Sequence, residues 1–363
     1  MFSITASANP YDEGMKRVRL LSESPNVRLL PFGRSGSGRQ IPAYVVSDFS
    51  VDPAMKARVA VVAGQHGDEY NPVKSVLTLS RRLSSGFRDD LLRRCLIIVV
   101  PMANPDGIAA HTRANASGTD INRDWFDRRT REAQYIHSII KAWRPHLIID
   151  AHEWTGPCAG PPNSVEQPHC GEADRERAMR IVAKRIAHAA GLAFIADGTD
   201  CDNRLLHRRY ALLGYASYLI ETAPDVDCAV KARAYIGAIE RAAECVAADG
   251  KLRLALSPSS TSFNPAGVSA YLEPIRTGPL ADPEASALAM LAAMTAAYCL
   301  MMWIVKPLTA STEPVWSRKY VKCSIDWETA AHTLMGKHGL APLTSRSWTH
   351  RRLRSRYAAH TLT

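Results

Sequence analysis

The sequence predicts an α/β protein, and two features of residues 57–250 indicate this class. Short apolar runs rich in Val and Ile recur along this region, as is typical of strands that are buried on both faces. Between them lie amphipathic stretches of helical length. Buried strands that alternate with helices imply a sheet covered by helices on both sides.

Five apolar runs predict the buried strands of this sheet. They are residues 57–64 (ARVAVVAG), 95–103 (CLIIVVPMA), 146–152 (HLIIDAH), 192–198 (LAFIADG) and 215–223 (YASYLIETA). Residues 20–50 are expected to add strands or a hairpin at the edge, with GRSGSGRQ (33–40) as a turn.

Four stretches between the runs predict helices, at residues 70–84, 129–143, 172–190 and 227–249. The stretch 172–190 has acidic residues in its first turn and Gly191 just after its end, which are typical start and stop signals. One domain is therefore predicted over residues 1–250.

The alternation of apolar runs and helical stretches ends near residue 250. Residues 251–285 are predicted as a linker or loop, and 286–363 as a C-terminal extension. Within the extension, residues 287–305 run without a charge and could cross a bilayer. A buried helix is favoured because alanine fills much of this run and the N-terminus lacks a secretory signal. The expected location is the cytoplasm, with membrane association as the alternative.

The net charge of +10 lies mainly in the C-terminal tail, since residues 306–363 hold ten Lys and Arg against three acidic residues. The first 305 residues are close to neutral, so no nucleic-acid partner is expected. The tail is expected to be a solvated stretch. The eight cysteines include no CxxC pair, which argues against a thiolate metal site.

Three candidate metal ligands follow predicted strands. His66 and Glu69 follow the strand 57–64, and His152 ends the strand 146–152. Side chains at the carboxyl ends of parallel strands meet at one edge of a sheet. Two histidines and one carboxylate bind one Zn²⁺ ion while leaving a position open for water, which suits catalysis.

Five further polar residues fit the needs of a zinc hydrolase. Glu221, at the end of the strand 215–223, is the candidate general base. Arg113 is a candidate to stabilise the oxyanion, and Asn122 and Arg123 are candidates to hold a substrate carboxylate. Asp120 is a candidate hydrogen-bond partner of a ligand histidine.

Together, five ordered motifs resemble those of the zinc carboxypeptidase family. They are H-x-x-E (66–69), N-P-D-G (104–107), R-x-N-x-x-G-x-D-x-N-R (113–123), D-x-H (150–152) and a strand-terminal Glu221. The resemblance covers about residues 28–250. It implies a mixed, twisted sheet of about eight strands between helices. It also implies the same roles for His66, Glu69, His152, Glu221, Arg113, Asn122, Arg123 and Asp120 as the chemistry above suggests.

Two departures bear on the substrate. Asp68 stands where digestive members carry an arginine, and the form H-G-D-E is similar to bacterial members that include a murein-peptide amidase. The tyrosine that caps the substrate in digestive members has no clear counterpart, since Tyr210, Tyr215 and Tyr218 lie nearer to Glu221 than the family spacing implies.

The leading hypothesis is a zinc-dependent metallocarboxypeptidase that cleaves a peptide or murein-peptide amide bond next to a free carboxylate. One alternative is a zinc-dependent acyl-amino-acid deacylase similar to succinylglutamate desuccinylases, which share the ligand pattern. A second alternative is a non-catalytic binding role through the basic tail. The sequence gives no oligomeric state.

Overall fold

The computed structural model describes residues 9–154, 163–197 and 202–258. The chain divides into two units, residues 1–278 and 279–363, and every described residue belongs to the first. The predicted apolar helix 287–305 and the basic tail lie outside the described residues. Among the helices that are described, none combines the length and the apolar character needed to cross a membrane.

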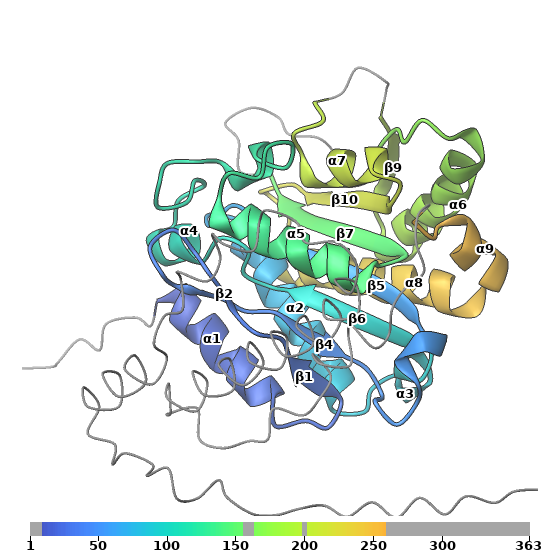
Figure 1. The fold of residues 1–363 in the computed structure, drawn as a ribbon, viewed down its shortest axis with the longest axis horizontal. Coiled ribbons are helices and arrows are strands. Elements are labelled where there is room, and N and C mark those ends of the chain that lie inside the picture. The colour runs from blue at the N-terminus through green and yellow to red at the C-terminus, as the bar shows by residue number, and fades with distance from the viewer. Residues whose placement is uncertain (1–8, 155–162, 198–201, 259–363) are drawn as a thin grey trace, which may run out of the picture. The chain divides into compact units, whose positions relative to one another are not determined.

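A mixed sheet of eight strands forms the centre of the described region, in the order β1-β4-β6-β5-β7-β10-β8-β9 (Figure 1). This confirms the predicted α/β class and the expected eight-stranded mixed sheet. The strands are β1 (Val27–Leu29), β4 (Tyr44–Val46), β5 (Ala57–Ala63), β6 (Cys95–Val100), β7 (Leu147–Glu153), β8 (Ser164–Gln167), β9 (Ala193–Ala196) and β10 (Ala216–Thr222); β2 (Gly33–Arg34) and β3 (Gln40–Ile41) form a separate hairpin.

The helices cover both faces of the sheet. They are α1 (Pro10–Leu21), α2 (Tyr70–Ser84), α3 (Asp89–Leu92), α4 (Pro105–Ala110), α5 (Arg131–Trp143), α6 (Ala173–Ala190), α7 (Leu206–Leu212), α8 (Cys228–Ala248) and α9 (Gly250–Ala255), with short 3-10 turns η1 (Pro53–Met55) and η2 (Ile121–Arg123). The four predicted helices are confirmed as α2, α5, α6 and α8, each within two residues at either end.

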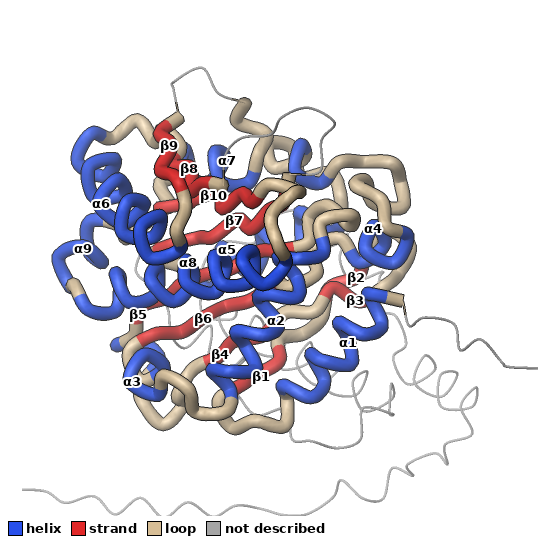
Figure 2. The backbone as a smooth tube through the Cα atoms, turned by 180° about the vertical axis from the view of Figure 1, so that it is seen from behind, coloured by secondary structure: helices blue, strands red, loops and turns tan. Residues whose placement is uncertain are grey.

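Successive side chains of each central strand point to opposite faces of the sheet, and each face packs into its own hydrophobic core. In β5, Val59 and Val61 face the core formed with α1, α2, α6 and α8, whereas Ala60 and Val62 face the core formed with α5 and α7. Helices α2 and α8 cover the face of the sheet that Figure 2 shows.

The five predicted strands are confirmed as β5, β6, β7, β9 and β10. Strands β5, β6, β7 and β10 are buried on both faces, which is why their sequences read as apolar runs. The predicted burial of 192–198 is wrong, because β9 lies at the edge of the sheet and its residues Ala193 and Ala196 are exposed.

Some elements lacked a clear sequence signal. Strand β8 is the polar tetrapeptide SVEQ, and helix α7 spans only seven residues. Helix α1 does carry a start signal, since Asn9 accepts a hydrogen bond from the backbone N–H of Tyr11 and Pro10 follows it. Pairing within the sheet and packing on it, rather than local propensity, stabilise β8 and α7.

The parallel strands β5, β7 and β10 end at the same edge of the sheet. Ala63 pairs with Ala151, and Glu221 pairs with His152. Residues that pair across neighbouring strands point to the same face, so His152 and Glu221 lie side by side on the face covered by α5 and α7. The loop after β5, which carries His66 and Glu69, leaves the sheet at this same edge.

Two glycines hold that loop against the N-P-D-G segment. A Cβ atom on Gly67 would lie 1.9 Å from the carbonyl carbon of Gly107, so only glycine fits at this position. The backbone N–H of Gly67 also donates to the carbonyl of Thr112 (2.9 Å). Asn104 caps α4 by accepting from the N–H of Gly107 (2.8 Å). The two motifs are therefore packed backbone to backbone beside the candidate ligands.

We expect Gly67→Ala to lower the free energy of unfolding by about 1–3 kcal/mol, because the clash is with backbone and no side-chain rotation relieves it. Gly36→Ala is the matched control, since nothing lies within 4 Å of its Cβ position. The control should change the free energy by less than about 1 kcal/mol. Urea denaturation of the full chain measures both values, and equal stabilities would contradict this packing.

Candidate metal centre and active site

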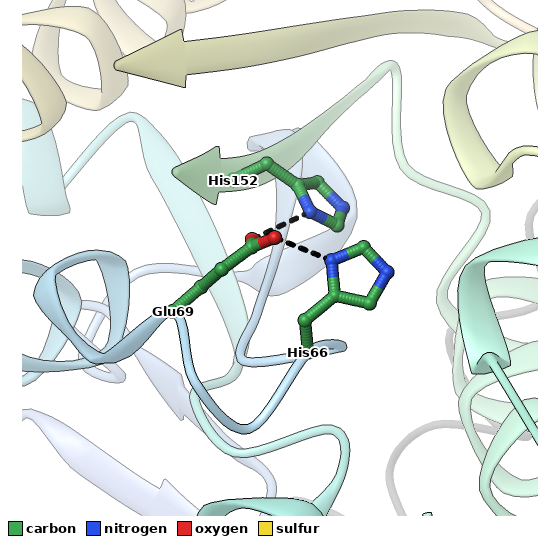
Figure 3. Close-up of side chains that lie close together, drawn as sticks. All are labelled: His66, Glu69 and His152. Atoms are coloured by element: carbon green, nitrogen blue, oxygen red, sulfur yellow. Dashed lines mark hydrogen bonds and ion pairs between the residues drawn. The ribbon is translucent and has the colours of Figure 1, made fainter. Parts of the chain in front are cut away.

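The three predicted metal ligands converge at the carboxyl edge of the sheet (Figure 3). Glu69 lies between the two histidines, with Oε1 2.5 Å from His66 Nδ1 and Oε2 2.9 Å from His152 Nδ1. All three side chains are buried. Burial raises the pKa of the Glu69 carboxyl, but His152 and His66 outweigh burial and lower it to about 2. Glu69 is therefore an anion.

The outer nitrogen of each histidine faces another carboxylate. His66 Nε2 lies 3.0 Å from Asp120 Oδ1, and His152 Nε2 lies 3.0 Å from Asp150 Oδ1. These carboxylates favour protons on both Nε2 atoms, so a bound metal would take the place of the protons shared between the two Nδ1 atoms and Glu69. Acceptors gathered in this way are stabilised by a cation among them, and the nitrogen and oxygen donors suit Zn²⁺.

Two residues that the sequence analysis did not select support His152. Asp150 lies two residues earlier on β7 and is fully buried, and Gln65 Nε2 donates to its Oδ1 (2.5 Å). Trp125 Nε1 donates in turn to Gln65 Oε1 (2.7 Å). The period of two along a strand was the available signal for Asp150, because it places Asp150 and His152 on one face.

Helix α8 supports the same strand end from the opposite face of the sheet. The hydroxyl of Tyr235 donates to the carbonyl of His152. Lys231 Nζ lies 2.6 Å from Glu153 Oε1, and both groups are buried. The backbone N–H of Glu153 donates to Glu69 Oε2 (3.0 Å). These contacts fix the end of β7 and hold Glu69 in place.

Glu221 lies beside the ligand cluster as a buried carboxyl group. Its Oε1 atom has no hydrogen-bond partner in the described part of the chain. Burial raises the pKa of Glu221 to about 8; His152 opposes this, and the anions Glu69 and Asp150 add to it. A carboxyl with a raised pKa and an unpaired oxygen is suited to take up and release a proton.

Arg113 and Asp120 border the cluster on the solvent side. Arg113 Nη1 lies 3.5 Å from Glu69 Oε1, and its Nε donates to Asp120 Oδ2 (3.0 Å). Asp120 also caps η2 by accepting from the N–H of Asn122 (2.9 Å). The positive guanidinium is thus adjacent to the ligands and still partly exposed.

Asn122 and Arg123 differ in their surroundings. Asn122 is buried, with Nδ2 3.2 Å from His152 Nε2 and Oδ1 accepting from the N–H of Leu206 (3.1 Å). Arg123 is partly exposed, and its closest anionic partner is Asp202 at 3.9 Å. Of this pair, Arg123 is the more accessible to a ligand.

A polar hollow of about 520 Å³ adjoins Asp120 and Arg123. It is lined by acidic, basic and hydroxyl side chains, including Asp124, Asp127, Arg129, Arg131, Thr130 and Glu132. Charged side chains of both signs therefore border the candidate site on this side.

The three tyrosines that precede Glu221 lie away from the ligands. The hydroxyl of Tyr210 bonds to His137 Nδ1 (2.8 Å), and that of Tyr218 donates to the carbonyl of Met179 (3.0 Å). Tyr215 packs edge-on against Tyr210. These positions assign them to the core.

The site geometry agrees with a known protein family. Residues 18–183 match a family model described as zinc carboxypeptidase. This part of the chain is similar to the zinc carboxypeptidase family. The zinc carboxypeptidase region includes His66, Glu69 and His152, and Glu221 lies beyond it.

Two named relatives share part of this zinc carboxypeptidase region. Carboxypeptidase 2 of Trichophyton equinum is 28% identical over 199 residues, which cover 48% of this chain and 37% of that protein. Murein peptide amidase A of Escherichia coli (strain K12) is 32% identical over 107 residues, covering 30% of this chain and 41% of that one. The chain therefore spans well under half the length of both relatives.

Solved structures support the fold of the zinc carboxypeptidase region. A metallo-carboxypeptidase from Burkholderia cenocepacia has a TM-score of 0.55 at 20% identity, covering 66% of this chain and 69% of that one. The carboxypeptidase A from Helicoverpa armigera has a TM-score of 0.56 at 19% identity, covering 66% and 74%. At such identities the likeness establishes the fold alone.

The raised pKa of Glu221 predicts a pH-dependent stability of the metal-free protein. The folded state holds this proton up to about pH 8, whereas an unfolded glutamate loses it near pH 4.5. Stability is therefore lost as pH rises between these values, by at most ~1.4 kcal/mol per pH unit. Glu221→Gln should remove this loss, so its advantage over the parent should grow from pH 5 to pH 8. Urea denaturation at each pH measures the difference, and a constant difference would contradict the raised pKa.

Proposed function

We propose that this protein is a zinc-dependent metallocarboxypeptidase that hydrolyses a peptide or peptide-like amide bond next to a free carboxylate. The observation that carries the proposal is the position of Glu221. This buried carboxyl has an unpaired oxygen and pairs in register with His152, beside a set of two histidines and one carboxylate. The family match supports the same chemistry.

His66, Glu69 and His152 would hold the metal through two Nδ1 atoms and the carboxylate. When bound, Zn²⁺ supplies Lewis-acid activation of water and of the scissile carbonyl. Asp120 and Asp150 keep the Nε2 protons in place, so the Nδ1 lone pairs stay available. Burial of all three side chains limits competition from solvent.

Glu221 is proposed as the general base. Its carboxylate takes a proton from the attacking water while the water oxygen forms the new bond to the carbonyl carbon. The same carboxyl then delivers that proton to the amide nitrogen as the carbon–nitrogen bond breaks. The products are a carboxylic acid and an amine, the second proton of the water passes from the acid to the amine to give a carboxylate and an ammonium group, and Glu221 returns to its starting state.

Arg113 and Arg123 supply the positive charge of the proposed mechanism. Arg113, beside Glu69, would stabilise the negative charge that develops on the carbonyl oxygen. Arg123, which is partly exposed, would bind the free carboxylate of the substrate, with Asn122 adjacent to it. A guanidinium at this position would make hydrolysis depend on a terminal carboxylate.

The substrate class is proposed from the relatives and from the loop sequence. The named relatives include fungal carboxypeptidases and a murein peptide amidase. Asp68 in H-G-D-E resembles the bacterial form, so murein-type peptides with a γ-D-glutamyl–diaminopimelate bond belong in the first assay. The polar hollow beside Arg123 also suits a polar substrate.

The full chain should bind one Zn²⁺ and should hydrolyse peptides in a chelator-sensitive way. Glu221→Gln should retain the metal but lower kcat by about 10²–10⁴-fold, because it removes the base and leaves the ligands intact. His152→Ala should lose the metal itself. Metal content is measured on the same samples as turnover, and an active Glu221→Gln enzyme would refute the assigned base.

Arg123→Met should lower kcat/KM for free-carboxylate peptides by about 10–100-fold and should leave amidated peptides almost unaffected. Arg93→Met is the matched control, because Arg93 is an exposed arginine that pairs with Asp48 near the opposite edge of the sheet. Equal losses on free and amidated peptides would argue against a carboxylate clamp. If N-acyl amino acids were hydrolysed and no peptide were, the deacylase alternative would replace this proposal.

A further inference from the structure

A chain of buried polar side chains runs across the sheet from the ligand His152. Asp150 Oδ1 faces His152 Nε2, and Asp150 Oδ2 lies 3.1 Å from His207 Nδ1. His207 Nε2 lies 2.9 Å from Glu166 Oε1, which also accepts from Arg208 Nη2 (2.8 Å). The chain thus connects a candidate metal ligand to α7 and to the edge of the sheet.

The sheet register explains how His207 bridges the two carboxylates. Asp150 on β7 and Glu166 on β8 both pair with Leu219 of β10, one from each side. The two carboxylates therefore lie on the same face, two strands apart, and His207 of α7 spans the gap between them. His207 and Asp150 are both fully buried, with an exposed fraction of 0%.

Each nitrogen of His207 faces a carboxylate oxygen, so both contacts are hydrogen bonds only when the ring is protonated on both nitrogens. Burial lowers the pKa of His207, but the hydrogen bonds with Asp150 and Glu166 outweigh burial and raise it. A buried carboxylate such as Asp150 is costly unless it is paired, and His207 supplies one of its partners.

The outer end of this chain already contains its own cation. Glu166, Asp197 and His207 lie close enough to hold a metal ion. However, Arg208 Nε lies 2.6 Å from Asp197 Oδ2, and its Nη2 binds Glu166. The guanidinium already balances these two carboxylates, so we assign no second metal there. This cluster contacts the candidate metal centre through the hydrogen bond between His207 and Asp150.

We propose that His207 is a positioning residue for the metal centre: by donating to Asp150 Oδ2 it holds that carboxylate in place against His152 Nε2. The ring of His152 is then held with Nδ1 directed toward the proposed metal position. This inference rests on the metal centre of the proposed function. Nothing in the short sequence around His207 indicates it, since the contact exists only through α7 packing on the sheet.

Two substitutions test the contacts of the two ring nitrogens of His207 independently. In His207→Asn the side-chain amide nitrogen can occupy the position of Nδ1 and donate to Asp150. In His207→Gln the longer side chain places its amide near the original position of Nε2. The amide can then donate to Glu166, and Asp150 Oδ2 loses this donor. Both variants remove the charge and the ring, so they differ mainly in which carboxylate receives a hydrogen bond from the side chain.

His207→Gln should weaken Zn²⁺ binding by about 10–100-fold, as is typical for the loss of an outer partner of a metal ligand. His207→Asn should stay within about threefold of the parent. The affinity is measured on the full chain by competition with a chromogenic zinc chelator, which requires no turnover. The thermal midpoint of each metal-free protein is recorded beside it, as a measure of general destabilisation.

His146→Gln is the control for the loss of a buried histidine. His146 precedes β7 at its opposite end, and its Nδ1 accepts from the N–H of Arg58 (2.9 Å). This variant should leave Zn²⁺ affinity unchanged even if its thermal midpoint falls. Equal zinc affinities for the His207→Asn and His207→Gln variants would overturn the inference and leave the proposed function standing. A parent chain that binds no zinc would overturn both.

Discussion

The parallel register of β10 on β7 is the constraint on which the site depends. It sets Glu221 directly opposite His152, so the proposed general base and a candidate metal ligand share one face of the sheet at one edge. Parallel neighbours carry their carboxyl ends to the same side, and the pairing of β5 with β7 brings the loop with His66 and Glu69 to that edge as well. A slip of one residue would turn Glu221 to the other face.

The site is an assembly of buried charges that are held by partners outside the ligand set. Isolated buried ions are strongly destabilising, and here the carboxylates of Glu69, Asp150 and Glu153 have partners that limit this cost. Asp150 contacts Gln65 and His207, and Glu153 contacts Lys231. Two apolar cores on the faces of the sheet provide the stability that such an arrangement requires. Glu221 differs in that its Oε1 atom is unpaired in the described part of the chain, and this difference supports its proposed role as the base.

The partners of the site come from four distant segments of the chain. Gln65 precedes a ligand, Asp150 lies on β7, His207 lies on α7, and Lys231 lies on α8. Only Asp150 had a sequence signal, through its position two residues before His152. The others are single polar residues in helices or loops, where sequence spacing gives no information about what they contact. Their roles follow from packing across the sheet.

The sequence by itself determined the alternation of buried strands with amphipathic helices, because residues buried on both faces must be apolar and helices need a periodic apolar face. It also determined which residue types stand at the ends of the strands, and so the candidate ligands His66, Glu69 and His152. Only the tertiary structure decided the strand order, the pairing of Glu221 with His152 and the contacts that orient each imidazole. Strand order and register depend on contacts between segments tens of residues apart, and local sequence patterns do not encode those contacts.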